Sequence, residues 1–427
     1  QLYFDSVSLF KVRFNPYGSI SCKFVFAVYG RKMPPTIIRV DLTKSVENQP
    51  QPMHNRWHPS IPPVARVRVG ESFRVECMDW TGGQIKNNDS ADDIENVDLT
   101  RIHILSGPIY VEGAEPNDLL VVDILDIGTL PEMEWGFTGI FAKHNGGGFL
   151  TDHYPKAAKA IWEFEGRHAT SRHIPGVRLT ALMHPGLIAC TPSMELLNEW
   201  NRRERQLVAD ETITVPPRAL LPEKHGACVG SLKGNEAIRI CEEAARTIPP
   251  REHGGNCDIK NLTIGSKAYL PVYVPGAKLS VGDIHFCQGD GEISYCGAIE
   301  TAGYIDLKLS LIKNGVNKYK QKNPMFSPSV SRFTYGPQLV FEGISVDEAG
   351  RQYYMDANVA YRQAALNAIE YLKMQGYTGE QAYILLSAAP VDGHLNSLVD
   401  APNSCCTLSL PLEIFDRDIS PKVDVAK

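Results

Sequence analysis

The chain has 427 residues, of which 43% are hydrophobic and 22% are charged, and its formal net charge is −6. These values are typical of a globular protein, and the length allows two or three domains or one large β-rich domain. The mildly acidic balance argues against a nucleic-acid or anionic-membrane binder. No uninterrupted apolar run approaches the roughly 20 residues that span a bilayer. We therefore expect a protein that binds neither nucleic acid nor membrane.

The ten cysteines are scattered along the chain and form no CxxC pair. A chain of this length needs no disulfides to stabilise its core, so reduced thiols and a cytoplasmic location are expected. Two N-x-S/T matches, at Asn88 and Asn261, are short enough to arise by chance.

The first 32 residues differ in composition from the rest. They begin with Gln1 and carry five basic residues against one acid. Met33 follows them, shortly before the first predicted strand. A basic, acid-poor stretch is compatible with a transit peptide, but its apolar run at 24–29 is short for a secretory signal. The favoured interpretation of residues 1–32 is an extension of unclear role, and residues 33–427 are expected to form a single large unit.

Residues 34–130 carry the first clear β pattern. We expect strands at 37–42, 64–69, 73–77 and 119–125, separated by turns. Strands at this spacing, together with 35 glycines and 29 prolines, indicate a mainly β protein with accessory helices (α+β). The core is predicted to be a β-sandwich or barrel-like structure with long loop insertions and a C-terminal helix pair.

Residues 131–260 are less regular and are predicted to be a loop-rich insertion. They hold a Gly-rich segment at 145–148, a charged stretch at 194–207 and two Pro-Pro breaks. One helix is expected after Asn235, because apolar residues repeat there with a helical period. Long loops in a compact protein are commonly functional.

The pattern returns to β over 261–345, with strands expected at 268–274 and 277–286. A helical segment is predicted at 352–390. Its clearest helix spans 356–374, where apolar residues form one stripe and Gly376 follows the end. A second, shorter helix is expected to open at 378–381.

The densest polar group spans 252–292 and is the first candidate site. It combines two histidines, several carboxylates and many glycines. Imidazole and carboxylate donors suit zinc or a harder divalent ion, and glycine lets a loop approach a small ligand closely. A hairpin between 265 and 286 would bring His253 and Asp258 beside His285. No spacing matches HExxH or paired CxxC, and each residue alone is equally well explained as a turn former or surface residue.

Two further segments are weaker candidates. Asp79 ends a predicted strand and would face a sheet edge, although an ordinary turn aspartate beside a core tryptophan explains it equally well. His184 precedes a proline and is therefore extended, but a lone histidine is more often structural. The segment 143–148 lacks the GK[ST] of a phosphate loop, so we expect no nucleotide site.

A cysteine nucleophile is a third type of candidate. Glu223, Lys224 and Cys228 bring an acid, a base and a thiol close together in sequence, which is the residue set of nitrilase-type amidases. Those enzymes take the three residues from separate strands of an α/β sandwich, and this chain lacks the βαβ alternation. Cys257 and Cys287 are more simply explained as small packing residues.

Five segments, taken together, carry a resemblance to a known family. They read DWTGGQI (79–85), SGPIYVEGA (106–114), HGGNCD (253–258), YLPV (269–272) and GDIH with QGDGE (282–292). In this order they resemble the acetamidase/formamidase family, in the long-loop form of fungal formamidases. The resemblance covers about residues 34–415 and leaves 1–32 without a counterpart. Some members have Met at Cys257 or Gln288, which argues against essential chemistry at these two positions.

The resemblance implies a β-rich homo-oligomer that hydrolyses formamide, or another short aliphatic amide, to the carboxylic acid and ammonia. It also implies a bound divalent ion. The ligands are inferred from residue chemistry alone: zinc is expected to be held by His253, Asp258, His285 and Asp79. Such an ion lowers the pKa of a bound water and polarises an amide carbonyl.

The remaining roles follow from the same chemistry. Glu292 or Asp290 is expected to take the water proton and return it to ammonia, and Asn256 or a glycine N–H to stabilise the oxyanion. The candidates for substrate binding are Trp80, Gln84, His184 and Tyr295. Three different functions would also fit the sequence: a non-catalytic small-ligand-binding β-protein, an amidase with a Cys nucleophile, and an amidohydrolase of the same family that acts on longer or cyclic amides.

Overall fold

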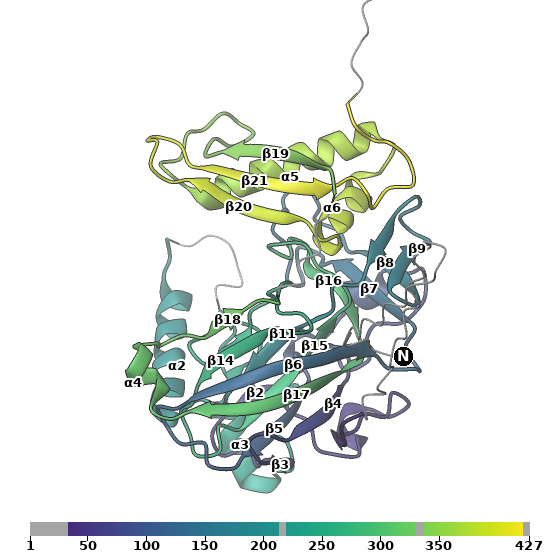
Figure 1. Cartoon of the computed structure of the whole chain (residues 1–427). Coiled ribbons are helices and arrows are strands. Elements are labelled where there is room, and N and C mark those ends of the chain that lie inside the picture. The colour runs from purple at the N-terminus through teal and green to yellow at the C-terminus, as the bar shows by residue number, and fades with distance from the viewer. Residues whose placement is uncertain (1–32, 213–218, 330–335, 422–427) are drawn as a thin grey trace, which may run out of the picture. The chain divides into compact units, whose positions relative to one another are not determined.

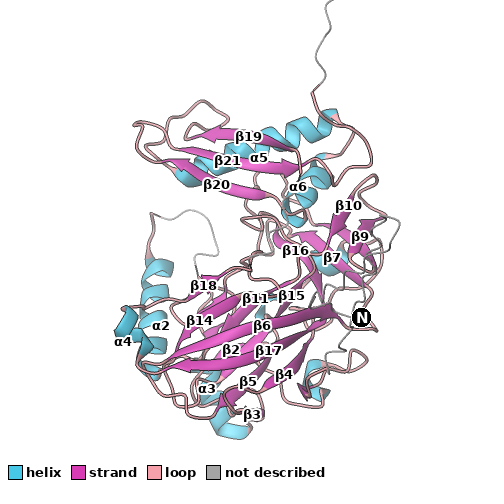
Figure 2. Ribbon diagram, viewed as in Figure 1, coloured by secondary structure: helices cyan, strands magenta, loops and turns pink. Residues whose placement is uncertain are grey.

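Two large β-sheets contain most of the described strands (Figures 1 and 2). The computed structural model describes residues 33–212, 219–329 and 336–421, and the described residues from Thr36 onward form one compact unit. The predicted extension of residues 1–32 lies outside the described residues. None of the helices in these ranges is long and apolar enough to cross a lipid bilayer.

The first sheet has six strands and is organised around its two longest members, β6 and β17. They run antiparallel in a register that joins Leu119 to Ile312 and Thr129 to Gly303. The strand predicted at 119–125 lies within β6, whose first four residues are all buried. β17 lies in the region predicted to be β-rich, although no separate strand was predicted there. The strand order is β1 (Thr36–Ile38), β4 (Ser72–Cys77), β17 (Gly303–Ile312), β6 (Leu119–Thr129), β14 (Lys267–Pro271) and β18 (Met325–Ser327).

The second sheet has ten strands and contains the central strand β15. Its main order is β10 (Arg178–Thr180), β9 (His168–Ser171), β8 (Ala158–Glu165), β7 (Trp135–Ile140), β16 (Tyr295–Thr301), β15 (Leu279–His285), β11 (His184–Ala189) and β13 (Gly254–Asn256). Two further strands, β5 (Leu105–Val111) and β3 (Ala65–Val67), continue from β15.

The region 131–260, which the sequence predicts to be rich in loops, supplies six strands of this second sheet, β7 to β11 and β13. Local sequence patterns do not reveal these strands for two reasons. Every residue of β11 is buried, so the strand lacks the alternation of a half-exposed strand. β9, β10 and β13 are only three or four residues long.

The two sheets share one hydrophobic core. Phe73 and Leu307 from the first sheet and Ile109 and Val281 from the second are at most 1% exposed and belong to the same cluster. Sheets that bury their inner faces against each other form a sandwich. The predicted class, mainly β with accessory helices, is confirmed, and the described strands form open mixed sheets rather than a closed barrel.

Two smaller sheets complete the strands. β2 (Arg56–Trp57) pairs with β12 (Ala245–Arg246). The third sheet has the order β19 (Gln338–Ile344), β21 (Cys405–Pro411), β20 (Asp392–Ser397). Helix α5 (Ala357–Met374) packs on β19 and β21, and α6 (Gly379–Ala388) packs on β16 and β7. Figure 1 shows α5 lying along the three-stranded sheet.

The two predicted C-terminal helices are confirmed. The Thr378 hydroxyl accepts the N–H of Gln381, and the Gln381 side chain accepts the N–H of Thr378, which is a capping box. The predicted helix after Asn235 is α3 (Gly234–Glu243), whereas α2 (Met194–Ala209) occupies a charged stretch that was predicted as loop. The remaining helices are α1 (Asp92–Glu95), α4 (Gly315–Tyr319) and the 3-10 turns η1 (Val46–Asn48) and η2 (Leu99–Arg101).

Asp118 ties the start of β6 to the end of β17. Its Oδ1 accepts the N–H of Asn314 at 2.8 Å, and its Oδ2 accepts the N–H of Glu115 at 2.9 Å and the Lys313 ammonium at 2.5 Å. Burial acts to raise the pKa of this carboxyl, but the ion pair with Lys313 and the two N–H donors lower it below its ordinary value.

We expect Asp118→Asn to lower the free energy of unfolding by about 1–3 kcal/mol at neutral pH, because buried donors lose their acceptor. Since the pKa of Asp118 is lowered in the folded chain, its stabilisation is present above the ordinary value of 3.8 and is lost as pH falls through the folded value. Urea denaturation of both chains along a falling pH series measures this. A difference that does not shrink in acid would contradict the assignment.

Candidate metal centre and active site

Five ionisable side chains converge in the middle of the ten-stranded sheet: Asp258, Asp283, His285, Glu292 and Glu300. Asp283 and His285 belong to β15, and Glu300 of β16 is paired directly with His285. Asp258 follows β13, and Glu292 lies in the loop before β16. Their ligand atoms form two groups that share His285, and within each group all atoms lie within 4.8 Å of one another. We call these five residues the carboxylate cluster.

His285 is the centre of the carboxylate cluster. Its Nε2 lies 3.2 Å from Oδ1 of Asp283 and 3.0 Å from Oε2 of Glu300. These three atoms and Oδ1 of Asp258 are buried and have no hydrogen-bond partner among the described residues. Buried polar atoms in folded proteins nearly always have a partner. Four such atoms at one place therefore indicate a cation-binding site.

The pKa values in the cluster show how strongly its charges interact. Burial acts to lower the pKa of His285, but Glu300 and Asp283 raise it well above its ordinary value. Burial and the neighbouring carboxylates Glu292 and Asp283 raise the pKa of Asp258 well above its usual range. These carboxylates can be ionised together only beside a proton or a metal cation that offsets their repulsion.

The backbone of the cluster is strained. Asp258, Asp283 and Glu292 have φ values of +49°, +58° and +43°. Residues other than glycine seldom adopt this left-handed conformation, and such strain is found preferentially at functional sites. The surrounding fold therefore holds three of the five cluster residues in costly conformations.

Gly186 of β11 provides the space for the cluster. A Cβ added at this position would lie 2.5 Å from Oδ2 of Asp283, 2.6 Å from Cε1 of His285 and 2.8 Å from Oδ1 of Asp258. The Gly186 carbonyl also accepts the N–H of Asp258 at 3.2 Å. Only glycine lets the β11 backbone approach the side chains this closely.

Gln288 and His184 orient His285. Nδ1–H of His285 donates to Oε1 of Gln288 at 2.9 Å, and Nε2 of Gln288 donates to the Asp258 carbonyl at 2.8 Å. This hydrogen bond keeps the proton on Nδ1, so Nε2, which faces the carboxylates, is the nitrogen that could bind a cation. His184 packs edge-on against His285, with ring centroids 5.0 Å apart, and burial lowers the pKa of His184 to about 3. His184, predicted to bind substrate, is thus a fully buried neutral neighbour of His285.

Two residues that were expected as metal ligands are not brought into either ligand group. His253 is fully buried between the rings of Trp57 and Trp200, at centroid distances of 4.7 and 4.6 Å. Oδ1 of Asp79 accepts the N–H and the hydroxyl of Thr81, at 2.9 and 2.5 Å, and so closes its own turn. The structure brings Asp258 and His285 together, but not through the predicted hairpin, because β14 and β15 belong to different sheets. Asp283 and Glu300 lie beside them in place of His253 and Asp79.

Of the three predicted catalytic residues, only Glu292 belongs to the carboxylate cluster, and Asp290 and Asn256 lie outside it. Asp290 lies outside the two ligand groups: its Oδ1 is 2.6 Å from Nζ of Lys260, and its Oδ2 accepts the N–H of Gly393 at 2.9 Å. Asn256 ends β13 two residues before Asp258, and its Oδ1 is buried without a hydrogen-bond partner in the described chain.

The remaining predicted substrate contacts are spread over the chain. Trp80 is buried with its ring centroid 5.2 Å from that of His103. Gln84 is hydrogen-bonded to Asp98, which precedes η2: Nε2 of Gln84 donates to the Asp98 carbonyl at 3.3 Å, and its Oε1 accepts the Asp98 N–H at 2.8 Å. Tyr295, at the start of β16, is 53% exposed.

Sequence reasoning missed Asp283, Glu300 and His103. Asp283 stands two residues before His285 on a predicted strand, and the alternation of a strand would have placed both on one face. Nε2 of His103 lies 4.0 Å from Oδ2 of Asp283, and its Nδ1 has no hydrogen-bond partner in the described ranges. No local signal marks Glu300 or His103, because strand pairing alone puts Glu300 opposite His285.

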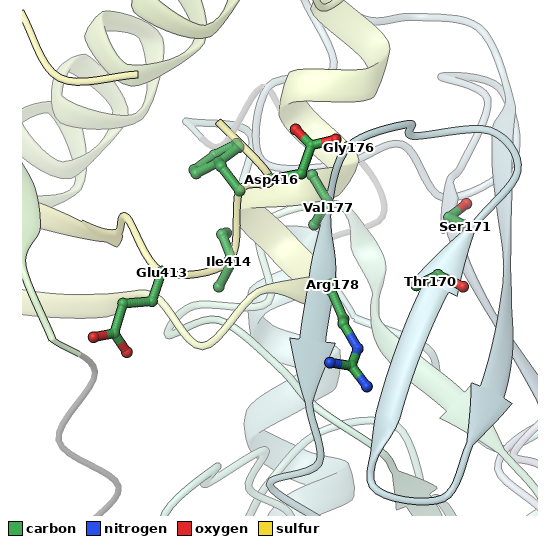
Figure 3. Close-up of a pocket in the computed structure, with 9 residues that line it drawn as sticks. Thr170, Ser171, Gly176, Val177, Arg178, Glu413, Ile414 and Asp416 are labelled. Atoms are coloured by element: carbon green, nitrogen blue, oxygen red, sulfur yellow. The ribbon is translucent and has the colours of Figure 1, made fainter. Parts of the chain in front are cut away.

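A surface pocket of about 420 Å³ lies elsewhere, where β9 and β10 meet the segment after β21 (Figure 3). It is lined by residues from 170–178 and 413–416, including Arg178 and Asp416. None of its lining residues belongs to the carboxylate cluster. The pocket carries charges of both signs, and none of its lining side chains has a buried polar atom without a hydrogen-bond partner, so nothing in it indicates a bound ligand.

Gly186→Ala is expected to abolish binding of a divalent ion, because the new Cβ would overlap three cluster side chains. Zinc bound per chain after dialysis, measured by plasma mass spectrometry, tests this. The matched control is Gly315→Ala in α4, whose Cβ would lie 2.8 Å from Cγ of Leu119 and away from the cluster. Equal zinc content in the two variants would contradict the assignment.

Comparison with known proteins finds relatives that match over most of the chain. A sequence profile of the Acetamidase/Formamidase family matches residues 39–417. A formamidase from Methylophilus methylotrophus is 60% identical over 392 residues, which cover 92% of this chain and 96% of that protein. An acetamidase from Mycolicibacterium smegmatis is 56% identical over 370 residues, 84% of this chain and 91% of that protein.

A solved structure is similar over nearly the same length. The gamma lactamase from Delftia acidovorans has 56% sequence identity and a TM-score of 0.89, and the match covers 91% of this chain and 95% of that one. Together with the profile match over most of the chain, these similarities show that the chain belongs to the acetamidase/formamidase family.

Proposed function

We propose that the protein hydrolyses formamide, or another short aliphatic amide, to the carboxylate and ammonia, with a divalent cation held at the carboxylate cluster. The observation that carries this proposal is the convergence of Asp258, Asp283, His285 and Glu300, each with a buried polar atom that has no hydrogen-bond partner among the described residues. The family membership and the formamidase and acetamidase relatives support the substrate class.

The donor set is suited to a divalent metal. One imidazole nitrogen and several carboxylate oxygens fit zinc, and a carboxylate-rich set also suits manganese. We assign zinc as the resident ion, held by His285 with Asp258, Asp283 and Glu300. When bound, such an ion lowers the pKa of a water and polarises an amide carbonyl.

Glu292 is the proposed general base. Its Oε1 accepts the N–H groups of Gly297 and Ala298 at 3.0 and 3.2 Å, which fixes the carboxylate beside His285 and Glu300. Burial raises the pKa of Glu292 above its ordinary value. A carboxylate with a raised pKa takes a proton from water more readily and can return it to the departing ammonia.

Asn256 and Trp80 are the proposed substrate contacts. The Asn256 side chain and the Trp80 indole N–H each have a buried polar atom without a hydrogen-bond partner in the described chain. The unpartnered Asn256 atom is the acceptor Oδ1, which is suited to accept an N–H of the substrate amide. The unpartnered Trp80 indole N–H is a donor, and a donor near the reacting carbonyl stabilises the oxyanion of an acyl-transfer reaction. Asn256 stands two residues before Asp258 in the sequence, and Trp80 packs on His103, which lies next to Asp283.

A cysteine nucleophile is not favoured. Burial raises the pKa of Cys228, and its sequence neighbours Glu223 and Lys224 are engaged in ion pairs with Arg246 and Glu242. Burial also raises the pKa values of Cys257 and Cys287 to about 12. Thiols with such pKa values are not ionised at neutral pH, and the thiolate is the nucleophile.

The known relatives bear on whether the chain is catalytic and on which amides it hydrolyses. Formamidase and acetamidase relatives at 60% and 56% identity do not favour a non-catalytic binding protein. The gamma lactamase of Delftia acidovorans adds a cyclic amide to the substrates that need testing. A homo-oligomer and a cytoplasmic location are also part of this proposal, and light scattering and cell fractionation test them.

Removal of the metal is expected to abolish ammonia release from formamide, and zinc is expected to restore it. The measurement compares the untreated protein, the chelator-dialysed protein and the same sample with zinc or manganese added back, with metal content determined in parallel. Full activity in a verified metal-free sample would overturn the metal assignment. No ammonia from formamide, acetamide or a lactam would overturn the amide-hydrolase proposal.

Glu292→Gln is expected to lower kcat by about 10²- to 10⁴-fold, because it removes the proton acceptor but keeps the shape of the side chain. Zinc content and the thermal unfolding midpoint should change little. Glu236→Gln, at an exposed position of α3, is the control. Turnover by Glu292→Gln close to that of the control would refute the role of Glu292 as the base.

A further inference from the structure

Lys260 is a buried cation shared by two carboxylates. Its side chain is 2% exposed, and its Nζ lies 2.6 Å from Oδ1 of Asp290 and 2.8 Å from Oδ1 of Asp392. A buried lysine that binds two carboxylates holds three chain segments at one point, because its removal would leave the carboxylates without a counter-ion.

The three segments joined by Lys260 are all relevant to the carboxylate cluster. Lys260 stands two residues after Asp258, and Asp290 stands two residues before Glu292. Asp392 is the first residue of β20 and lies shortly after α6. The ion bridge therefore connects the loop of a proposed metal ligand, the loop of the proposed base and the C-terminal part of the fold.

Further hydrogen bonds attach the Glu292 loop to the C-terminal part. Gly289 N–H donates to the Ser387 carbonyl at 2.7 Å, and Asp290 N–H donates to the Val391 carbonyl at 3.0 Å. The Tyr361 hydroxyl donates to the Asp290 carbonyl at 2.8 Å. A Cβ at Gly289 would lie 2.4 Å from a carbonyl oxygen of α6. The Glu292 loop is thus hydrogen-bonded to α5, α6 and the segment that leads into β20, and it packs closely against α6.

We propose that Lys260 is a positioning residue, which uses Asp290 and Asp392 to hold the loops of Asp258 and Glu292 at the geometry that catalysis needs. This inference rests on the proposed function of the carboxylate cluster. It gives Asp290 a role different from that of an acid–base group, since both its carboxylate oxygens are engaged. It also makes the active-site geometry depend on the C-terminal segment that begins at Asp392.

The chain offers a matched control for a buried lysine. The Lys159 side chain in β8 is 1% exposed, and its Nζ lies 2.8 Å from Oδ2 of Asp93 in α1. Neither residue belongs to the carboxylate cluster. Lys159→Met and Asp93→Asn therefore report the general cost of breaking a buried ion pair in this protein.

The experiment compares Lys260→Met and the milder Asp392→Asn with these two controls. Disruption of groups that orient metal ligands typically costs about 10- to 100-fold in activity or metal affinity. We expect Lys260→Met to lower kcat and zinc affinity by about this factor, with KM changed by less than about threefold. Asp392→Asn is expected to show a smaller loss in the same direction, and the controls to keep wild-type kcat.

Hydrogen–deuterium exchange separates this inference from the proposed function. Peptides that cover 256–260 and 288–297 should exchange faster in Lys260→Met and Asp392→Asn than in the wild type and the controls. If the wild type releases no ammonia from any amide, the proposed function is overturned. The exchange comparison still tests the positioning role, because it does not depend on turnover. Unchanged exchange in both loops, or wild-type kcat in Lys260→Met, would overturn the positioning role.

Discussion

Four carboxylates gathered around one buried imidazole set the main physical constraint on this protein. At separations near 3 Å, as between His285 and its partners Asp283 and Glu300, the interaction of charges in a low-dielectric interior outweighs any single hydrogen bond. The arrangement is stable only when a proton or a cation offsets the repulsion. Gly186 leaves room for three of the side chains in the cluster. The oxygen and nitrogen atoms that have no hydrogen-bond partner among the described residues face one another there.

The sandwich supplies the rigidity that such a site requires. His285 and Glu300 lie on paired strands in the middle of the larger sheet, and all residues of β11 and β15 are buried. Sites on strands are held more accurately than sites on loops. The two loop residues, Asp258 and Glu292, are fixed by other means: Gly186 and Gln288 bind the backbone of Asp258, and two N–H groups bind Glu292.

Two successive sets of neighbouring residues hold His285 and the rest of the cluster in place. Gln288 sets the tautomer of His285, and the neutral His184 packs against its ring. Farther out, Lys260 joins the flanking loops to the C-terminal segment. The outer residues limit the movement of the inner ones, and residues distant in the sequence contribute to this support. This supporting role explains why polar residues such as Gln288 and Lys260 are buried although we propose no chemical step for them.

Sequence alone determined the features that depend on local pattern. The helix ending before Gly376, the cap at Thr378 and the β pattern of 119–125 follow from residues close together in the chain. The density of polar residues over 252–292 likewise predicted that Asp258, His285 and Glu292 lie close together. Tertiary structure decided the rest. Glu300 and Gly186 enter the site through the register of β16 and β11 with β15, and His253 is left out because it packs between Trp57 and Trp200. The physical reason is that the convergence of side chains depends on the pairing of strands about a hundred residues apart, as between His184 and His285, which no local pattern encodes.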